Sequence, residues 1–409
     1  MTVRRSLALR LLRKGMSQPD ELSLKRSGWK QWWNSLNYDA KGSLKHLQQN
    51  LMDQLQFDSG ISVENSMLLG EINQWRISNP TAKAVGVPTL MIHGYAASSM
   101  TFFRNFEQLS LSLKDVYAVD LPGNGLSKEL PLSVDSMQKP DRVEFNETVK
   151  GQYFRLQNPV DEEKYKKHLA HYEDYYVDAL EKWRKENKLS KINLVGHSYG
   201  GYLTFKYSLK YPDNVHKLCL VSPLGVERSI FSIHNHLEPE RDYEIQSEDP
   251  SKSNYSNKRN IPKLILQYQN KALRWMGPLG AKACWGYVNS SYGRVPSVPY
   301  REYVFQLVFG KGIMTDTSIR IFNQLFSRSL LAYDPIMDSL DKVKVSKLML
   351  VYGEHDWMNK VAGRLAIEEF NSIRKSYDGT FDIVSRAGHN LVLDNPSEFN
   401  SKLVDFLRD

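Results

Sequence analysis

The sequence predicts an α/β fold, with a mostly parallel sheet, helices on both of its faces and an inserted helical cap. Two observations support this fold class. Apolar strand-like runs alternate with segments of helical periodicity, and continuous apolar strands are typical of a parallel sheet covered on both faces. In addition, residues 226–335 separate two of these runs, where a single crossover helix would be long enough.

The first half of the sheet is expected before residue 190. Residues 86–95 form an apolar run with a glycine near its end, and residues 99–113 carry apolar side chains at helical spacing. A second apolar run, residues 115–125, stops at a Pro-Gly turn. Residues 128–167 are polar and poorly periodic and predict a surface excursion, whereas residues 171–188 have the pattern of an amphipathic helix.

The second half of the sheet follows the same alternation. Residues 191–197 are expected to form a buried strand, and residues 199–211 the helix that follows it. Further strands are expected at residues 216–225, 346–356 and 380–389, because each is a short apolar run next to turn residues.

The long interruption before residue 346 predicts an inserted cap. Its first part, residues 237–260, is polar, and apolar and aromatic helical sequence follows at residues 264–287 and 318–333. A cap at this point would cover the carboxyl ends of the strands, where α/β sheets bind ligands. The expected domains are an amino-terminal extension (1–59), a core (60–225 and 335–409) and the inserted cap (226–334).

The amino-terminal extension carries most of the net charge. Residues 1–50 contain ten Lys or Arg and three Asp or Glu, while the whole chain has a net charge of +8. A basic, leucine-rich start without an acidic residue before position 20 is typical of a mitochondrial transit peptide. The alternatives are a solvated basic tail and a segment that lies on an anionic membrane.

The composition excludes several classes of protein. Apolar residues make up 41% and charged residues 24% of the chain, as in ordinary globular proteins. No apolar run reaches the roughly 18–20 residues that a membrane-spanning helix needs. The two cysteines, Cys219 and Cys284, argue against a disulfide framework and are expected to be buried packing residues. We expect no metal, no cofactor and no nucleic-acid partner.

A catalytic serine is predicted within the segment Gly196-His197-Ser198-Tyr199-Gly200. An apolar strand precedes it and a helix follows it, so Ser198 would sit on a sharp turn with its side chain pointing off the sheet edge. Gly196 and Gly200 would let the strand and the helix approach closely. A plain glycine turn is the alternative, but the partners that a catalytic serine needs are also present.

The serine hydroxyl needs a base, and the base needs an orienting acid. In this architecture the chain order is serine, acid, histidine. His389 is the candidate base, because it follows the last expected strand directly. Asp356 is the candidate acid, at the third position after Gly353, with Glu354 as the substitute. A loop histidine with its hydrogen bonds satisfied and a solvated acid are the alternatives.

An oxyanion hole requires two backbone donors. One is the N–H of Tyr199, at the start of the helix after the nucleophile, where the helix dipole helps. The other is expected in the turn after the first strand, where His93 and Gly94 make the bend and Tyr95 supplies its N–H, with Ala96 next in line. His93 itself is expected to pack in the loop rather than to catalyse.

These residues resemble the α/β-hydrolase superfamily. The resemblance rests on residues 92–95 (IHGY), 120–127 (DLPGNGLS) and 196–201 (GHSYGG), and it covers about residues 60–225 and 335–409. The H-x4-D at residues 389–394, together with YGEHDWMN at 352–359, is similar to abhydrolase subfamily 4/5. That group includes lysophospholipases, lysophosphatidic acid acyltransferases, a mitochondrial cardiolipin-specific deacylase and a lipase co-activator.

The resemblance implies a serine enzyme that acts on phospholipids. The co-activator branch lacks the nucleophilic serine, whereas this chain has Ser198. The first expectation is a cardiolipin deacylase, mitochondrial and peripheral to the inner membrane. The alternatives are a lysophosphatidic acid acyltransferase that uses acyl-CoA and a non-catalytic lipase regulator, and, for location, a lipid droplet or a cytosolic membrane surface.

Two further features have open interpretations. Asp394 ends the H-x4-D, which the family links to acyl transfer, but residues 395–398 have the pattern of a helix start, so Asp394 is expected to stabilise that helix end. Aromatic residues in the expected cap would form either its core or an acyl-chain channel or membrane-facing surface. These residues are Trp275, Trp285, Tyr287 and Tyr292.

Overall fold

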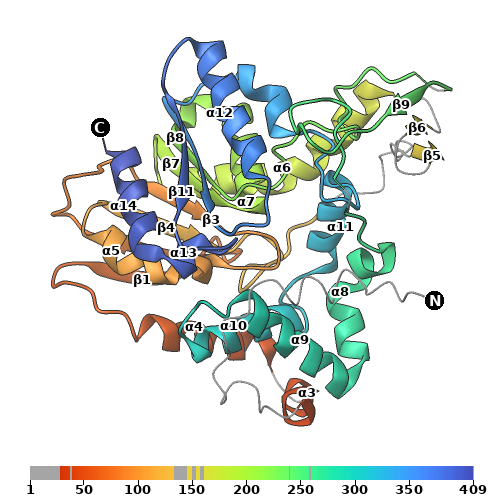
Figure 1. The fold of residues 1–409 in the computed structure, drawn as a ribbon. Coiled ribbons are helices and arrows are strands. Elements are labelled where there is room, and N and C mark those ends of the chain that lie inside the picture. Colours follow the sequence, from red (N-terminus) through yellow and green to blue (C-terminus); the bar gives the residue numbers. More distant parts are fainter. Residues whose placement is uncertain are drawn as a thin grey trace.

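A single large sheet forms the centre of the protein. The computed structural model describes residues 28–36, 39–132, 145–149, 153–156, 161–238, 240–257 and 259–408. The strands of this sheet are β1 (Ser62–Leu68), β2 (Ile72–Ser78), β3 (Thr89–Ile92), β4 (Asp115–Val119), β7 (Ile192–His197), β8 (Val215–Val221), β10 (Lys347–Gly353) and β11 (Gly379–Val384). They lie in the order β1-β2-β4-β3-β7-β8-β10-β11 (Figure 1). From β4 to β11 all neighbours are parallel, and only the β1–β2 and β2–β4 pairs are antiparallel.

Helices surround this sheet, and a small second sheet lies apart from it. The α-helices are α3 (Gly28–Leu36), α4 (Ala40–Met52), α5 (Phe106–Ser110), α6 (Glu162–Glu186), α7 (Tyr199–Lys210), α8 (Lys263–Trp275), α9 (Gly277–Ser291), α10 (Val298–Phe309), α11 (Asp316–Leu325), α12 (Lys360–Arg374), α13 (Leu391–Asp394) and α14 (Pro396–Leu407). Short 3-10 helices are η1 (Ser99–Asn105), η2 (Pro212–Asn214) and η3 (Ile336–Lys342). The second sheet is antiparallel and pairs β5 (Phe145–Val149), β6 (Tyr153–Leu156) and β9 (Asp242–Glu244).

Both faces of the large sheet are covered, as the apolar strands predict. In β8, Leu218 and Leu220 pack in the hydrophobic cluster that includes α6, α7 and α12. Cys219 and Val221, on the opposite face, pack in the cluster that includes α4, α5, α10 and α14. All six strands expected from the sequence lie in this sheet, so the fold class is confirmed.

Three elements differ from the expectation. The helix expected over residues 99–113 is instead η1 followed by the short α5. Strands β1 and β2, which extend the sheet on one side, were not assigned from the sequence. The polar stretch at residues 237–260 contributes strand β9 to the small sheet, where Phe154 pairs with Tyr243.

The inserted segment between β8 and η3 contacts the amino-terminal extension. It carries α8 to α11, and α3 packs against α9 while α4 packs against α10 and η1 (Figure 1). Leu44 and Leu51 of α4 are fully buried, so the extension from Ala40 onward is part of the packed structure. Residues 1–27, on which the targeting prediction depends, lie outside the described residues. Within the part that the structure describes, no helix combines the length and apolar character needed to cross a bilayer.

Candidate active site

Ser198 lies at the sharp turn between β7 and α7. Its φ of 56° and ψ of −116° fall outside the common left-handed region, so this backbone is strained for a non-glycine residue. The flanking glycines have no room for a side chain. A Cβ on Gly196 would lie 2.4 Å from the carbonyl oxygen of Gly200, and one on Gly200 would lie 2.4 Å from the carbonyl oxygen of His93. This packing explains why glycines flank the serine.

His389 and Asp356 come together at the same edge of the sheet. Nδ1 of His389 lies 3.1 Å from Oδ1 of Asp356. The turns that carry these residues touch, because a Cβ on Gly353 would lie 2.1 Å from the carbonyl oxygen of Gly388. Each turn follows a strand of the parallel sheet, β10 for the acid and β11 for the histidine. The structure therefore places the candidate base beside the candidate acid, and both follow Ser198 in the chain order that the sequence predicts.

Asp356 is buried and held in its charged form. Burial acts to raise its pKa, but the neighbouring His389 and hydrogen bonds from His389, Met358 and Ser222 outweigh this effect and lower the pKa to about 2. The N–H of Met358 donates to Oδ1 at 3.0 Å, and the Ser222 hydroxyl donates to Oδ2. A carboxylate fixed in this way can hold the His389 ring in one orientation.

The two other acids near His389 have different partners. Glu354 accepts the backbone N–H of Arg386 at 2.8 Å, so it holds the turn after β11. Asp394 accepts the backbone N–H of Gly388 at 2.8 Å, one residue before the candidate base. At the start of α14 it is Asn395 that accepts the N–H of Glu398, and the expected effect of the Asp394 charge on this helix end stays a prediction. The buried Oδ1 of Asp394 has no hydrogen-bond partner among the described residues.

His197 connects the serine turn to the histidine turn. Its Nε2–H donates to the carbonyl oxygen of His389 at 2.9 Å, and the two ring centroids are 4.9 Å apart. Burial and the nearby His389 lower the pKa of His197 to about 3, so its ring is neutral. Among the described residues, no hydrogen bond joins Ser198 to His389 directly. Such contacts often tighten only when substrate binds.

The two expected oxyanion donors lie on adjoining turns. Tyr199 is the first residue of α7, where a helix leaves its N–H without an intrahelical acceptor. The Tyr95 turn packs against the serine turn, because a Cβ on Gly94 would lie 3.0 Å from the Cβ of Ser198. The rings of Tyr95 and Tyr199 are 6.3 Å apart. The roles of the two amides stay a prediction.

His93 stabilises the first of these turns. It is fully buried, its Nδ1–H donates to the carbonyl oxygen of Gly94 at 2.7 Å, and its Nε2 accepts the N–H of Leu121 at 2.9 Å. Burial lowers its pKa, so the ring is neutral. These contacts fit the loop-packing role that the sequence suggested.

Sequence reasoning missed four residues that border the site. Ser222 follows β8 directly and supports Asp356. The Trp357 ring centroid lies 5.0 Å from that of His389, and the Arg259 guanidinium lies 4.4 Å from the Trp357 centroid. On the other side, Nη1 of Arg294 lies 4.0 Å from Oδ2 of Asp394. Of these, only Trp357 had a signal in the sequence, since it directly follows the strand expected at residues 346–356.

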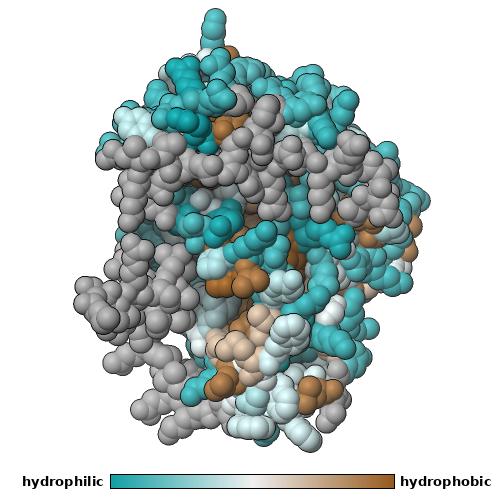
Figure 2. Space-filling model, turned by 90° about the vertical axis from the view of Figure 1, so that its right-hand side faces the viewer, coloured by the Kyte–Doolittle hydropathy of each residue, from teal (hydrophilic) through white to brown (hydrophobic). Residues whose placement is uncertain are grey.

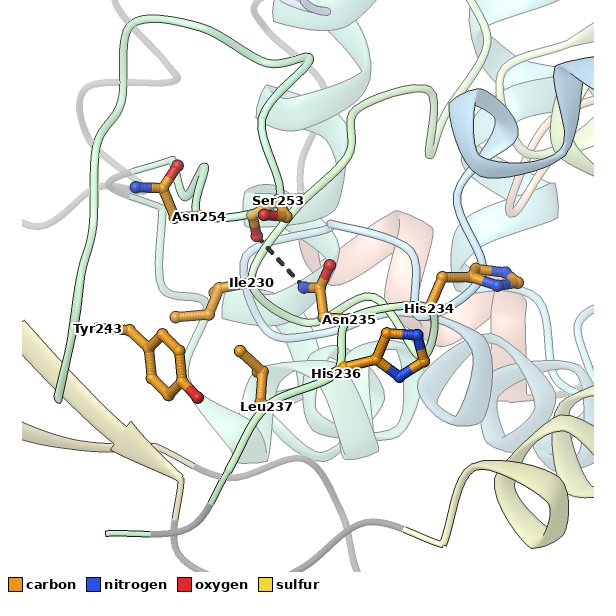
Figure 3. Close-up of a pocket in the computed structure, with 8 residues that line it drawn as sticks. All are labelled: Ile230, His234, Asn235, His236, Leu237, Tyr243, Ser253 and Asn254. Carbon is orange, nitrogen blue, oxygen red and sulfur yellow. Dashed lines mark hydrogen bonds between the residues drawn. The ribbon is translucent and has the colours of Figure 1, made fainter. Parts of the chain in front are cut away.

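A cavity of about 300 Å³ lies elsewhere in the inserted segment (Figure 3). Its lining residues are Ile230, His234, Asn235, His236, Leu237, Tyr243, Ser253 and Asn254. Its two histidines are paired with carboxylates, His234 with Asp334 at 2.8 Å and His236 with Glu162 at 2.9 Å. None of the residues of the candidate active site lines it, so we assign it no part in catalysis.

Comparison with known proteins agrees with this geometry. Residues 88–262 match the family model described as the alpha/beta hydrolase fold. Protein ECM18 of Saccharomyces cerevisiae is 43% identical over 99% of this chain and 89% of its own length. The 1-acylglycerol-3-phosphate O-acyltransferase ICT1 of the same yeast is 45% identical over 89% of this chain and 92% of its own length. The rat 1-acylglycerol-3-phosphate O-acyltransferase ABHD5 is 24% identical over 78% of this chain and 76% of its own length.

The chain belongs to the abhydrolase 4/5-like branch of the α/β-hydrolase superfamily. Solved α/β-hydrolase structures share its fold. Carboxylesterase CesB of Bacillus subtilis aligns with a TM-score of 0.52 and 16% identity over 90% of this chain and 99% of that one. A bacterial membrane phospholipase A aligns with a TM-score of 0.51 and 16% identity over 92% of this chain and 93% of that one. The abhydrolase 4/5 family and its named relatives support an enzyme of lipid metabolism, a lipid acyltransferase or hydrolase.

Proposed function

We propose that this protein is a serine-dependent acyltransferase that makes phosphatidic acid from acyl-CoA and lysophosphatidic acid. The observation that carries the proposal is the His389–Asp356 pair, which lies next to the strained turn that presents Ser198. The relative ICT1, named a 1-acylglycerol-3-phosphate O-acyltransferase and 45% identical to this chain, supports acyl transfer to 1-acylglycerol-3-phosphate over the cardiolipin deacylase that the sequence alone favoured.

The reaction has two steps in this proposal. Ser198 Oγ attacks the thioester carbonyl of acyl-CoA while His389 takes its proton, and the C–S bond breaks as the proton passes to the leaving thiolate. The free hydroxyl of lysophosphatidic acid then attacks the acyl-serine and gives its proton to His389. That proton returns to Ser198 as the acyl–serine bond breaks. The N–H groups of Tyr95 and Tyr199 would stabilise the oxyanion of each step.

The charge near His389 supports a phosphate-bearing acceptor. Arg259 has no carboxylate within ion-pair distance among the described residues, and its guanidinium lies over Trp357 beside the base. Burial lowers the pKa of Arg259, although the charges of Glu227 and Asp356 act in the opposite direction. Guanidinium groups suit phosphate because their N–H donors match its oxygens in pairs.

Purified full-length protein tests the proposal with two substrate mixtures. Labelled acyl-CoA with lysophosphatidic acid should give phosphatidic acid, and Ser198→Ala should abolish this product. Transfer that survives in the Ser198→Ala protein within tenfold of the parent would refute the serine-dependent mechanism. Cardiolipin is given in the second mixture.

Hydrolysis by the same residues is the second candidate, because water can replace the lipid hydroxyl at the acyl-serine. Free fatty acid and monolysocardiolipin in the second mixture, without phosphatidic acid in the first, would return the assignment to a cardiolipin deacylase. A lipase regulator without activity would show neither product and no labelling of Ser198 by a fluorophosphonate.

A further inference from the structure

Exposed apolar side chains are concentrated on three neighbouring helices. We call the surface of α3, α8, α9 and the α8–α9 link the outer cap face. Ten large hydrophobic residues are exposed on it: Trp29, Trp33, Leu36, Leu264, Ile265, Tyr268, Trp275, Met276, Leu279 and Tyr287. Figure 2 views the side of the molecule on which α8 lies and shows apolar residues gathered in its lower half. Clusters of this kind mark sites that bind another apolar surface.

Helix α8 exposes apolar side chains to solvent and buries a polar one, the reverse of the usual amphipathic helix. Its only buried residue is the polar Asn270, whereas Leu264 and Trp275 have exposed fractions of 69% and 86%. The exposed positions 264, 268 and 275 follow helical spacing and lie along α8, and the exposed Leu279 follows in α9, after the break at Gly277. Helix α3 likewise has no buried residue, although it packs against α9 through Trp32 and Gly28. The apolar stripe therefore has no partner within the described chain.

The charge of this face identifies its partner. Residues 28–36 and 263–291 contain five basic residues and no acidic residue. These residues are Lys30, Lys263, Lys271, Arg274 and Lys282, of which Lys271 is paired with Asp316 of α11 and Arg274 donates to the carbonyl oxygens of Phe309 and Gly310. Tryptophan and tyrosine favour the interface between water and lipid, and lysine and arginine are attracted to anionic headgroups. A protein partner would need an acidic apolar surface, whereas an anionic bilayer supplies negative charge and hydrocarbon together.

We propose that the outer cap face docks on the surface of an anionic phospholipid bilayer. Trp29, Trp33, Trp275 and Leu279 enter the interfacial region, and the side chains of Lys30, Lys263 and Lys282 contact the headgroups. This docking brings the active site to the lipid, because Gln269 on the inner side of α8 donates to the hydroxyl of Tyr95 at 2.9 Å. Helix α8 thus contacts both the membrane and the turn expected to hold one oxyanion donor.

Flotation with vesicles tests the docking surface without relying on catalysis. The full-length Ser198→Ala protein is mixed with vesicles of phosphatidylcholine alone or of phosphatidylcholine with phosphatidic acid. It should float mainly with the anionic vesicles. Adding Trp275→Gln and Leu279→Gln should lower the bound fraction at least tenfold. The matched control replaces Leu111 and Tyr377, which are 55% and 97% exposed on other elements, with Gln and should float as the parent does.

Three outcomes would overturn the proposal. In the first, the Trp275→Gln, Leu279→Gln protein binds vesicles as the parent does and loses this binding only at high salt. Membrane attachment would then be assigned to the basic residues before Gly28. In the second, the parent protein is a dimer, the variant is a monomer, and both bind vesicles equally. The outer cap face would then be a contact between two copies of the chain. Equal losses in the variant and in the control would show a general effect of removing apolar surface. Activity of the Ser198 parent on a soluble ester is measured separately, so a failed docking test leaves the proposed reaction intact.

Discussion

The carboxylate of Asp394 accepts a hydrogen bond from the backbone N–H of Gly388, so the two ends of the H-x4-D segment are held together through the main chain. The acid does not reach the imidazole, whose Nδ1 is bound to Asp356. In this structure the second acid of the motif supports the position of His389 through the backbone of the preceding residue. Its effect on catalysis should follow from that difference.

Asp394→Ala should slow hydrolysis and acyl transfer by the same factor. The substitution leaves the buried N–H of Gly388 without its acceptor and lets the His389 turn move, and a displacement of about 1 Å can cost about a hundredfold in rate. Hydrolysis of a small ester and transfer to lysophosphatidic acid are measured side by side. Asp405→Ala, at an exposed acid, is the control. Loss of transfer with hydrolysis intact would give Asp394 a direct role in transfer.

Ser198→Gly should inactivate the enzyme and stabilise the fold. Ser198 has a positive φ outside the left-handed helical region, and such strain costs on the order of 1–3 kcal/mol, part of which is offset by the extra freedom of glycine in the unfolded chain. We expect Ser198→Gly to unfold at higher urea concentration than Ser198→Ala, by about 1 kcal/mol in free energy. Equal midpoints for the two variants would show that the turn is not strained.

Asp356 should contribute to stability at neutral pH and lose this contribution in acid. Its pKa is lowered to about 2 in the folded protein, against about 3.9 in an unfolded chain. A lowered pKa stabilises the fold above about pH 4, by roughly 2.5 kcal/mol, and the contribution disappears as the pH falls toward 2. The free energy of unfolding of the parent minus that of Asp356→Asn should therefore shrink between pH 5 and pH 2. A difference that does not change over this range contradicts the assignment.

Gly200→Ala should destabilise the protein and remove activity. Its Cβ would lie 2.4 Å from the carbonyl oxygen of His93, so the serine turn and the Tyr95 turn must separate, at a cost of about 1–3 kcal/mol or more. Gly286→Ala in α9 is the matched control, because no atom lies within 4 Å of the new Cβ. That control should gain up to about 1 kcal/mol from helix propensity.

The first forty residues should direct a fluorescent reporter to mitochondria. They are basic and leucine-rich, and the first nineteen contain no acidic residue. The measurement is co-localisation of the fusion with a mitochondrial dye, with the same fusion carrying Arg4, Arg5 and Arg10 replaced by Gln as the control. A diffuse signal from the unaltered fusion would leave only a solvated tail.

The parallel part of the sheet could be predicted because its signals are local. Each of its strands is a short apolar run followed by a turn, and the turns after β7, β10 and β11 carry Ser198, Asp356 and His389. Strands β1 and β2 were not assigned because their signal is weak. β1 is an exposed edge strand, and the buried β2 contains Asn73, Gln74 and Arg76, whose hydrogen bonds come from distant segments.

The residues around Ser198, Asp356 and His389 could not be predicted, because their contacts join distant parts of the sequence. Arg259 reaches Trp357 across 98 positions of sequence, and Ser222 reaches Asp356 across 134. The contact of Asp394 with Gly388 could not be predicted, because the pattern of a helix start concerns Asn395, which caps α14 as the pattern indicates. The local pattern predicted the cap at Asn395 correctly, but it contained no information on the direction of the Asp394 carboxylate.

The burial of α4 sets a limit on how the amino terminus can be processed. Leu44 and Leu51 pack in the same hydrophobic cluster as α10 and the sheet, so the residues from Ala40 onward belong to the structure that holds the inserted segment in place. A protease that removes a leader would have to cut before Ala40 to leave a stable mature protein. Cleavage after Trp33 and before Ala40 would remove the tryptophans of α3 but keep α4, and would yield a shorter form that binds lipid more weakly.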